Sequence, residues 1–186
     1  AIVAGDREML KEVAKIDDEV DILHGDIVTY LGDISRKSLT EEQTRELVNL
    51  MSAVNDLENM GDIIETDLVH LGNERIRDNV SISSQTQAML KELHDTVANT
   101  VEMAFNAVTE NNELAAQDVI HMKADINRMM DSAAQHEAKR LVAEEPGRLP
   151  AYVLEIDIIE KLKRIYYFAK RMAKAVTPEE VLEHAG

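Results

Sequence analysis

Residues 40–62, TEEQTRELVNLMSAVNDLENMGD, decide the fold, because a helix start signal in them is followed by one long apolar stripe. Thr40 and Gln43 have the spacing of a capping box, in which two side chains satisfy free backbone amides at a helix N-terminus. Apolar residues then recur every three or four positions, as on one face of a helix: Leu47, Leu50, Met51, Val54, Leu57, Ile64 and Leu68. The pattern predicts a helix of more than about thirty residues that ends near Gly72 and Asn73.

The same apolar spacing recurs along the rest of the chain. It predicts four further helices, over about 6–36, 85–110, 113–143 and 150–176. The chain has only seven Gly and three Pro in 186 residues, which favours long helices over sheet. The sequence therefore predicts an all-α protein with five long helices.

The charge and composition exclude several classes of protein. The formal net charge of −16, from 36 acidic and 20 basic residues, repels nucleic acid and favours basic partners or cations. No apolar run approaches the length of about 20 residues that a membrane span needs. The absence of Cys excludes disulfides and thiolate sites and fits a reducing compartment. We therefore expect a cytoplasmic chain that does not itself cross the membrane or bind nucleic acid.

A weak internal repeat suggests how the helices are grouped. Residues 1–10 align with residues 107–116, and each segment is followed by two long helices. This alignment predicts two three-helix units, residues 1–76 and 82–178, followed by a tail at 179–186. The first helix of the first unit is then largely missing from the sequence. On this interpretation Ala1 to Ala4 form the last turn of that helix.

Two acidic segments resemble signatures of a known family. DLENMGD, residues 56–62, resembles the L-E-R-I-G-D signature of the PhoU family, and KIDDEVDILHGDI, residues 15–27, resembles its D-x-x-(I/V)-D segment. Within the family, the likeness is greatest to the cytoplasmic PhoU-like domain fused to bacterial sodium/phosphate (Na/Pi) cotransporters.

The resemblance implies a PhoU-like helical bundle that acts as a non-catalytic regulatory domain of phosphate transport or phosphate homeostasis. Its partner would be the membrane transporter domain of the same longer chain, or a separate transport protein. The domain would then be tethered to the inner membrane, and a homodimer is compatible with this arrangement.

The acidic residues of these segments lie close to apolar helix faces. Glu58 and Glu65 fall within about 40° of the centre of the apolar stripe, with Asp62 at its edge, and Asp17 and Asp21 border the apolar face of their own helix. A carboxylate turned toward apolar surface must be paired, protonated or bound to a metal. The default expectation is a basic partner from another helix and no cofactor. The resemblance implies the alternative, a cation such as Fe, Mn, Zn or Mg held by Asp17, Asp21, Glu58 and Asp62, and oxygen ligands suit several of these metals.

The second half of the chain has lost the corresponding acids. The repeat places Lys123 opposite Asp17 and Arg164 opposite Asp62, so a second metal cluster is not expected. The basic stretch at residues 161–174 could face a phosphate, an anionic membrane surface or an acidic partner, or it could balance acids of neighbouring helices. A ligand-free scaffold or adaptor that binds another protein remains an alternative function. A metalloenzyme of the di-iron type would need Glu-x-x-His, which the sequence lacks, so we do not expect an enzyme.

Overall fold

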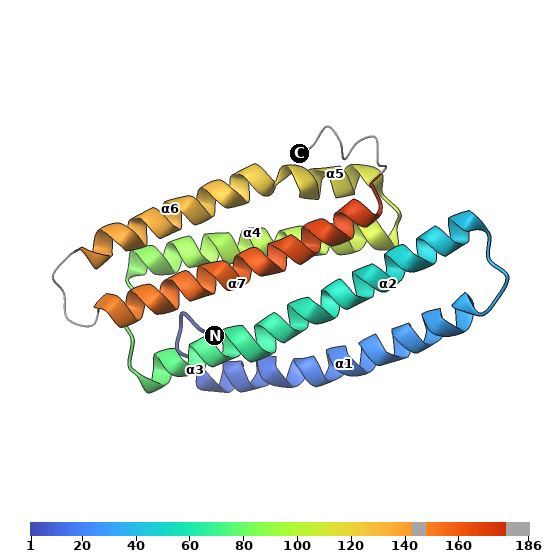
Figure 1. Ribbon diagram of the computed structural model, residues 1–186. Coiled ribbons are helices and arrows are strands. Elements are labelled where there is room, and N and C mark those ends of the chain that lie inside the picture. The colour runs from blue at the N-terminus through green and yellow to red at the C-terminus, as the bar shows by residue number, and fades with distance from the viewer. Residues whose placement is uncertain (143–147, 178–186) are drawn as a thin grey trace.

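The chain folds into a bundle of long helices in two groups (Figure 1). The computed structural model describes residues 1–142 and 148–177, and every regular element in these ranges is helical. The first group contains α1 (Arg7–Ser35), α2 (Glu41–Asp62), a π-helical segment η1 (Ile63–Leu68) and α3 (Val69–Arg77). The second contains α4 (Ser84–Thr109), α5 (Glu113–His121), α6 (Lys123–Leu141) and α7 (Arg148–Ala175). The prediction of an all-α fold is therefore confirmed.

Side-chain caps fix the starts of four helices. The Thr40–Gln43 capping box is complete: Gln43 N donates to Thr40 Oγ1 at 3.2 Å, and Thr40 N donates to Gln43 Oε1 at 3.0 Å. Asp6, Ser83 and Asn112 accept a backbone amide in the same way at the starts of α1, α4 and α5. Each of these caps satisfies an amide that the helix itself leaves free.

The second long helix continues beyond its predicted end. The segments α2, η1 and α3 follow one another without a break as far as Arg77, and the turn is made at Asn79, whose φ is 50°. Gly72 does not end the helix, because it lies buried inside α3 against α1. A Cβ atom at Gly72 would lie 2.7 Å from a methyl group of Leu10, so glycine serves here for the close approach of two helices.

The predicted helix at residues 113–143 is in fact two helices. It breaks at Met122, which ends α5 and begins α6 with a ψ of −12°. Neither Gly nor Pro marks this position, so apolar spacing alone could not reveal the break. Helix α7 begins at Arg148, slightly before its predicted start, and Pro150 lies in its first turn, where proline is tolerated. The predicted tail at residues 179–186 lies outside the described residues.

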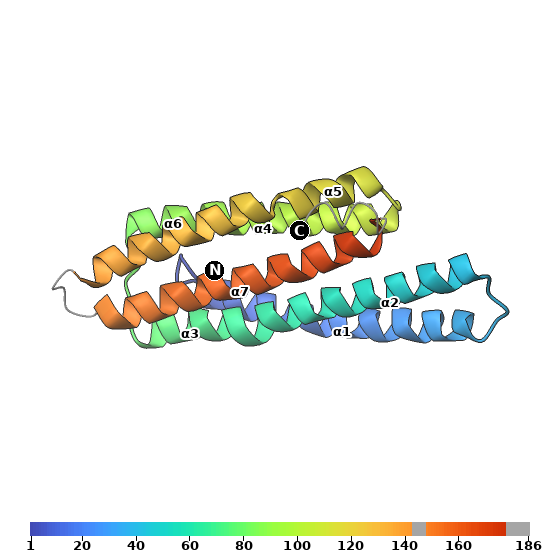
Figure 2. The same ribbon diagram turned by 45° about the horizontal axis from the view of Figure 1, so that its top comes forward.

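Helix α7 is the centre of the molecule. It buries twelve residues and packs against α2, α4, α5 and α6, whereas α1 buries only Leu10 and Leu31. Figure 2 shows α7 between the α5–α6 side and the α2 side of the bundle. Burying one large aliphatic side chain stabilises a fold by about 1.5–3 kcal/mol, so the core around α7 supplies most of the apolar stabilisation. Among the described helices, none is both long and apolar enough to span a bilayer.

Candidate functional site

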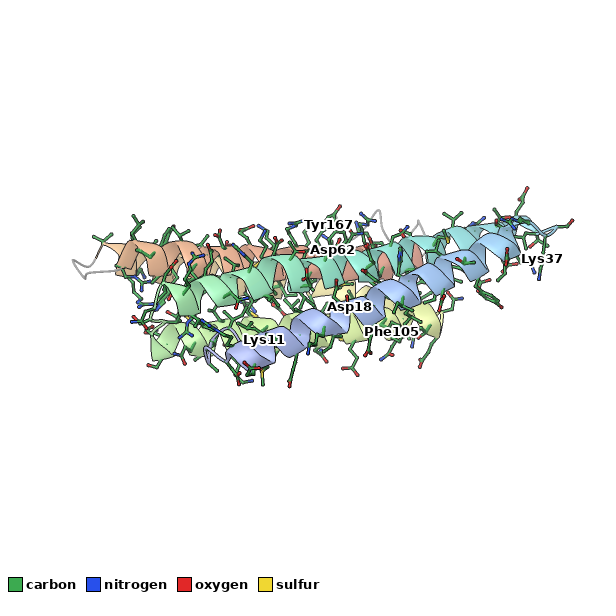
Figure 3. The ribbon with its side chains drawn as sticks, turned by 90° about the horizontal axis from the view of Figure 1, so that it is seen from below. Lys11, Asp18, Lys37, Asp62, Phe105 and Tyr167 are labelled. Atoms are coloured by element: carbon green, nitrogen blue, oxygen red, sulfur yellow. The ribbon has the colours of Figure 1, made fainter. Side chains whose placement is uncertain are left out.

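The three acids of DLENMGD divide between two faces of α2. Asp56 is buried, with 1% of its surface exposed, and it faces α7. Glu58 and Asp62 face the side of α1, because they lie two and six positions after Asp56, which correspond to rotations of about 200° and 240°. Figure 3 labels Asp62 on α2 and Asp18 on α1. One sequence motif therefore contributes to two different electrostatic environments.

The four predicted ligands lie on both sides of the α1–α2 contact, near enough for the charges of three of them to act on Asp17. The carboxylate of Asp17 lies directly over Gly61, where a Cβ atom would lie 2.8 Å from Asp17 Oδ1. The pKa of Asp17 is raised, first by burial and then by the negative charges of nearby acids: Asp21, Glu65, Asp62 and Glu58. In the described residues, no Lys or Arg forms an ion pair with any of these five acids. The expected basic partner is therefore not found at this acidic cluster, which consists of Asp17, Asp21, Glu58, Asp62 and Glu65.

A π-turn follows immediately after these acids. Segment η1 begins at Ile63, directly after Asp62, and includes Glu65. Its extra residue per turn changes the direction of the side chains that follow, and such turns are frequent at functional sites. Thr66 Oγ1 donates a hydrogen bond to Glu65 Oε2 at 2.8 Å.

The donor chemistry of the acidic cluster suits a hard cation, since all of its ligands would be carboxylate oxygens. Within residues 1–142 and 148–177, however, no three His, Asp or Glu side chains are arranged as a metal-binding group. The metal site at Asp17, Asp21, Glu58 and Asp62 therefore stays a prediction.

Basic residues of α7 balance acids of the first helical group. Arg171 Nη2 lies 2.6 Å from Asp56 Oδ1, and Asp67 Oδ2 lies 2.9 Å from Lys161 Nζ and 3.5 Å from Arg164 Nη1. Burial raises the pKa of Asp56, and the Arg171 charge only partly opposes this effect. Of the alternatives for the basic stretch, the geometry supports the one in which it balances neighbouring acids.

The C-terminal end of α7 carries a second group of basic residues. Lys170 lies over the ring of Tyr166, with its Nζ 5.9 Å from the ring centroid. Burial lowers the pKa of Lys170, and the nearby charges of Lys123 and Lys174 lower it further. Within the described ranges, none of these three lysines has a carboxylate within ion-pair distance. A positive patch therefore exists on an acidic protein.

A buried charged network that the sequence analysis missed joins α4, α6 and α7. Arg148 Nη2 donates to Glu155 Oε2 at 2.8 Å and also to Glu137. Thr86 Oγ1 donates to Glu137 Oε1 at 2.7 Å, and Arg140 Nη1 lies 3.2 Å from Glu137 Oε2. No sequence motif predicts these contacts, because partners such as Thr86 and Glu137 are 51 positions apart in the chain. Only the unusual placement of acids among apolar helix positions could have indicated them.

The two glutamates of this network differ in acidity. Burial raises the pKa of Glu155 to about 7, and the neighbouring Glu137 contributes to the same shift. Burial would also raise the pKa of Glu137, but hydrogen bonds from Glu155 and Thr86 and the charges of two arginines lower it below its ordinary value. Burial therefore favours the protonated form of Glu155, whereas the donors around Glu137 favour its ionised form.

The protein is a charged all-helical bundle in which two helical groups meet along α7. An acidic cluster lies at the α1–α2 contact, and a basic patch lies near the C-terminal end of α7. The sequence profile of the PhoU domain matches residues 1–66 and 90–176, so the chain belongs to the PhoU domain family. PhoU proteins are non-enzymatic regulators of phosphate homeostasis.

A solved structure supports the fold independently. The chain is similar to the crystal structure of PhoU from Pseudomonas aeruginosa, with a TM-score of 0.84 and 19% sequence identity. The match covers 94% of this chain and 82% of that chain. No curated protein sequence matches the chain.

Proposed function

We propose that the chain is a non-catalytic regulatory domain of phosphate transport, which controls uptake by docking on a transporter. The observation that carries this proposal is the match of the PhoU domain profile to both helical groups, together with the shared fold. The transporter is the membrane part of the same longer polypeptide, a sodium/phosphate cotransporter. This arrangement holds the domain in the cytoplasm at the inner membrane.

Transport measurements in the source organism test this function. Deleting the coding region of residues 1–186 while keeping the rest of the polypeptide should leave phosphate uptake active but insensitive to phosphate repletion, as measured with radiolabelled phosphate. Uptake that still falls normally after repletion would contradict the regulatory role. Western blotting of the remaining transporter is the control for its abundance.

The acidic cluster gives this domain a means to respond to a cation. Asp17, Asp21, Glu58 and Asp62 would hold Fe, Mn, Zn or Mg, and the cation would neutralise carboxylates that now repel one another. Elemental analysis of the untagged protein, compared with Glu58→Gln/Asp62→Asn, tests the site. Near-stoichiometric metal that disappears in the variant supports it, and metal-free wild-type protein argues against it.

A ligand-free adaptor is the second candidate function, and the lysine patch favours it. Lys123, Lys170 and Lys174 offer three positive charges to an acidic protein partner. In this case, reversing the charge of Lys170 and Lys174 to Glu abolishes capture of the partner while Glu58→Gln/Asp62→Asn leaves it unchanged. The opposite pattern favours the cation-dependent regulator.

A further inference from the structure

A small pocket opens between the end of α3 and the start of α7, and both helix ends lie at the same end of the bundle (Figure 1). Its volume is about 280 Å³. The apolar residues that line it are Leu71, Val80, Leu149, Pro150, Val153 and Leu154. Sites for drug-sized molecules have volumes of roughly 300–1,000 Å³, so this pocket is better suited to one or two side chains of a protein partner.

Exposed apolar side chains border this pocket. Leu149 and Val153 lie one turn apart on α7, and they are 62% and 50% exposed although both line the pocket. Helix α6 ends at the same end of the bundle (Figure 1), and its C-cap Val142 is 83% exposed. Single exposed apolar residues are ordinary, whereas exposed apolar residues beside an apolar pocket indicate a contact surface.

Arg75 gives the pocket a hydrogen-bond donor. Its Nη1 donates to Ile2 O at 3.1 Å and fixes the position of the guanidinium group. Its Nε is buried and has no acceptor in the part of the chain that the structure describes. A buried donor without an acceptor is unfavourable. A backbone carbonyl of a segment that enters the pocket would therefore stabilise Arg75 in its present place.

The charges at the pocket indicate the kind of partner. Three carboxylates line it, those of Glu74, Asp78 and Asp157, together with the one guanidinium group of Arg75. Arg77 lies 3.2 Å from Glu74 Oε1 and 2.8 Å from Asp78 Oδ1, but its side chain is 62% exposed. Asp157 has no ion-pair partner within residues 1–142 and 148–177. Since the whole chain has a net charge of −16, this uncompensated carboxylate favours a basic partner.

We infer that this pocket is the docking site for a basic cytoplasmic loop of the transporter, which places an apolar side chain between Leu149 and Val153 and a Lys or Arg beside Asp157. The inference rests on the proposed docking of the domain on a transporter. Cytoplasmic loops of membrane proteins carry an excess of Lys and Arg. Such a loop supplies the positive charge that the pocket lacks, and its backbone supplies an acceptor for Arg75.

The same charges argue against two other occupants. A second copy of the chain that met this surface with its own pocket would bring like carboxylates together, and both copies carry a net charge of −16. A membrane surface with anionic lipids would repel the carboxylates for the same reason, because the cytoplasmic leaflet has a negative surface potential. A basic protein segment is therefore favoured over both.

Cysteine labelling tests this inference, because residues 1–186 contain no natural Cys. Val153→Cys reports on the pocket. Leu114→Cys is the matched control, because Leu114 is 74% exposed and belongs to α5, at the other end of the bundle (Figure 1). Both variants are made in residues 1–186 and in the complete polypeptide in membrane vesicles. Labelling with a water-soluble maleimide is followed on the tryptic peptide by mass spectrometry, and circular dichroism of residues 1–186 checks the fold.

The expected result is protection of one site that depends on charge. In the complete polypeptide Val153→Cys should react at least about tenfold more slowly than in residues 1–186, while Leu114→Cys reacts equally in both. Adding Asp157→Lys should bring the rate of Val153→Cys back to within about twofold of that in residues 1–186, because the basic loop is then repelled. Glu102→Lys is the control for this reversal, since it changes the charge of an exposed position on α4.

Four results would overturn the inference. They are equal reactivity of Val153→Cys in both proteins, protection that survives Asp157→Lys, protection in residues 1–186 that increases with protein concentration, and protection of residues 1–186 by vesicles of phosphatidylglycerol and phosphatidylethanolamine. The third would identify a second copy as the occupant, and the fourth a lipid surface.

Uptake of radiolabelled phosphate by the same vesicles or cells separates this inference from the proposed function. If Val153→Cys is unprotected but uptake still falls after phosphate repletion, the domain regulates transport through another surface, and only the docking site is wrong. If uptake also fails to respond to repletion in the wild type, both the docking site and the regulatory function are wrong.

Discussion

Replacing the buried Glu155 by Gln should remove most of the dependence of stability on pH between about pH 5 and pH 8. Glu155 is 0% exposed, and it lies beside Glu137 between Arg140 and Arg148. The amide side chain of the Glu155→Gln variant has nearly the shape of a protonated carboxyl group, but it cannot release a proton. The variant therefore separates the shape of this side chain from its charge.

The magnitude follows from the raised pKa. The folded protein binds a proton on Glu155 up to about pH 7, whereas the unfolded chain releases it near the ordinary pKa of 4.5. This contribution to stability is therefore fully present below the ordinary pKa and is lost as the pH rises through 7. Its upper bound is about 3 kcal/mol, since each pKa unit corresponds to about 1.4 kcal/mol. The lowered pKa of Glu137 acts in the opposite sense but at lower pH, outside this window.

Urea unfolding at pH 5, 6, 7 and 8, followed by circular dichroism, provides the assay. The wild type should lose about 1–3 kcal/mol between pH 5 and pH 8, and Glu155→Gln should lose less than about half of that amount. His136 Nε2 lies 3.8 Å from Glu137 Oε1, so His136→Asn serves as a control for this neighbouring side chain. Identical pH profiles for the wild type and Glu155→Gln would refute the raised pKa of Glu155.

Three further changes test other contacts. Arg171→Met should destabilise the fold by about 3 kcal/mol in urea unfolding, because it leaves Asp56 buried without its counter-charge. Asp56→Asn should change the free energy of unfolding by less than about 1 kcal/mol, and similar costs for both variants would contradict this account. Gly72→Ala should lower the free energy of unfolding by about 1–3 kcal/mol, because the new methyl group meets Leu10. An unchanged urea midpoint would show that α1 and α3 can move apart without cost. Millimolar Mn²⁺ should raise the melting temperature of the wild type but not that of Asp62→Asn if the acidic cluster binds the cation, and an equal response in both would place the metal elsewhere.

The sequence predicts the helices well wherever a local signal marks their ends. The Thr40 capping box, the apolar stripes and the turn at Asn111 all depend on residues a few positions apart, and the structure has each of them. The break at Met122 and the continuation of the helix past Gly72 are different. They depend on how α5 packs against its neighbours and on the space beside Leu10, which local sequence does not report.

The candidate site shows the same limit. Helical geometry places Asp17 beside the acids of the second long helix. The apolar faces of the first two long helices pack together, so the acids that border these faces lie near one another. It could not assign Asp56 to Arg171, since these residues are 115 positions apart and many acids and bases compete in a highly charged chain. The identity of a buried ion pair depends on the packing of two helices, which only the structure reveals.

The π-turn at Ile63–Leu68 gives the long second helix two independently set halves. A π-turn is equivalent to one residue inserted into an α-helix, and it offsets everything after it by about 100°. The half before the turn meets α1 at Gly61 and α7 at Asp56, and the half after it meets α1 again at Gly72. A shortening by one residue within the turn would restore an ordinary helix, yet it would rotate Gly72 by about 100° away from Leu10 if Gly61 and Asp56 kept their contacts.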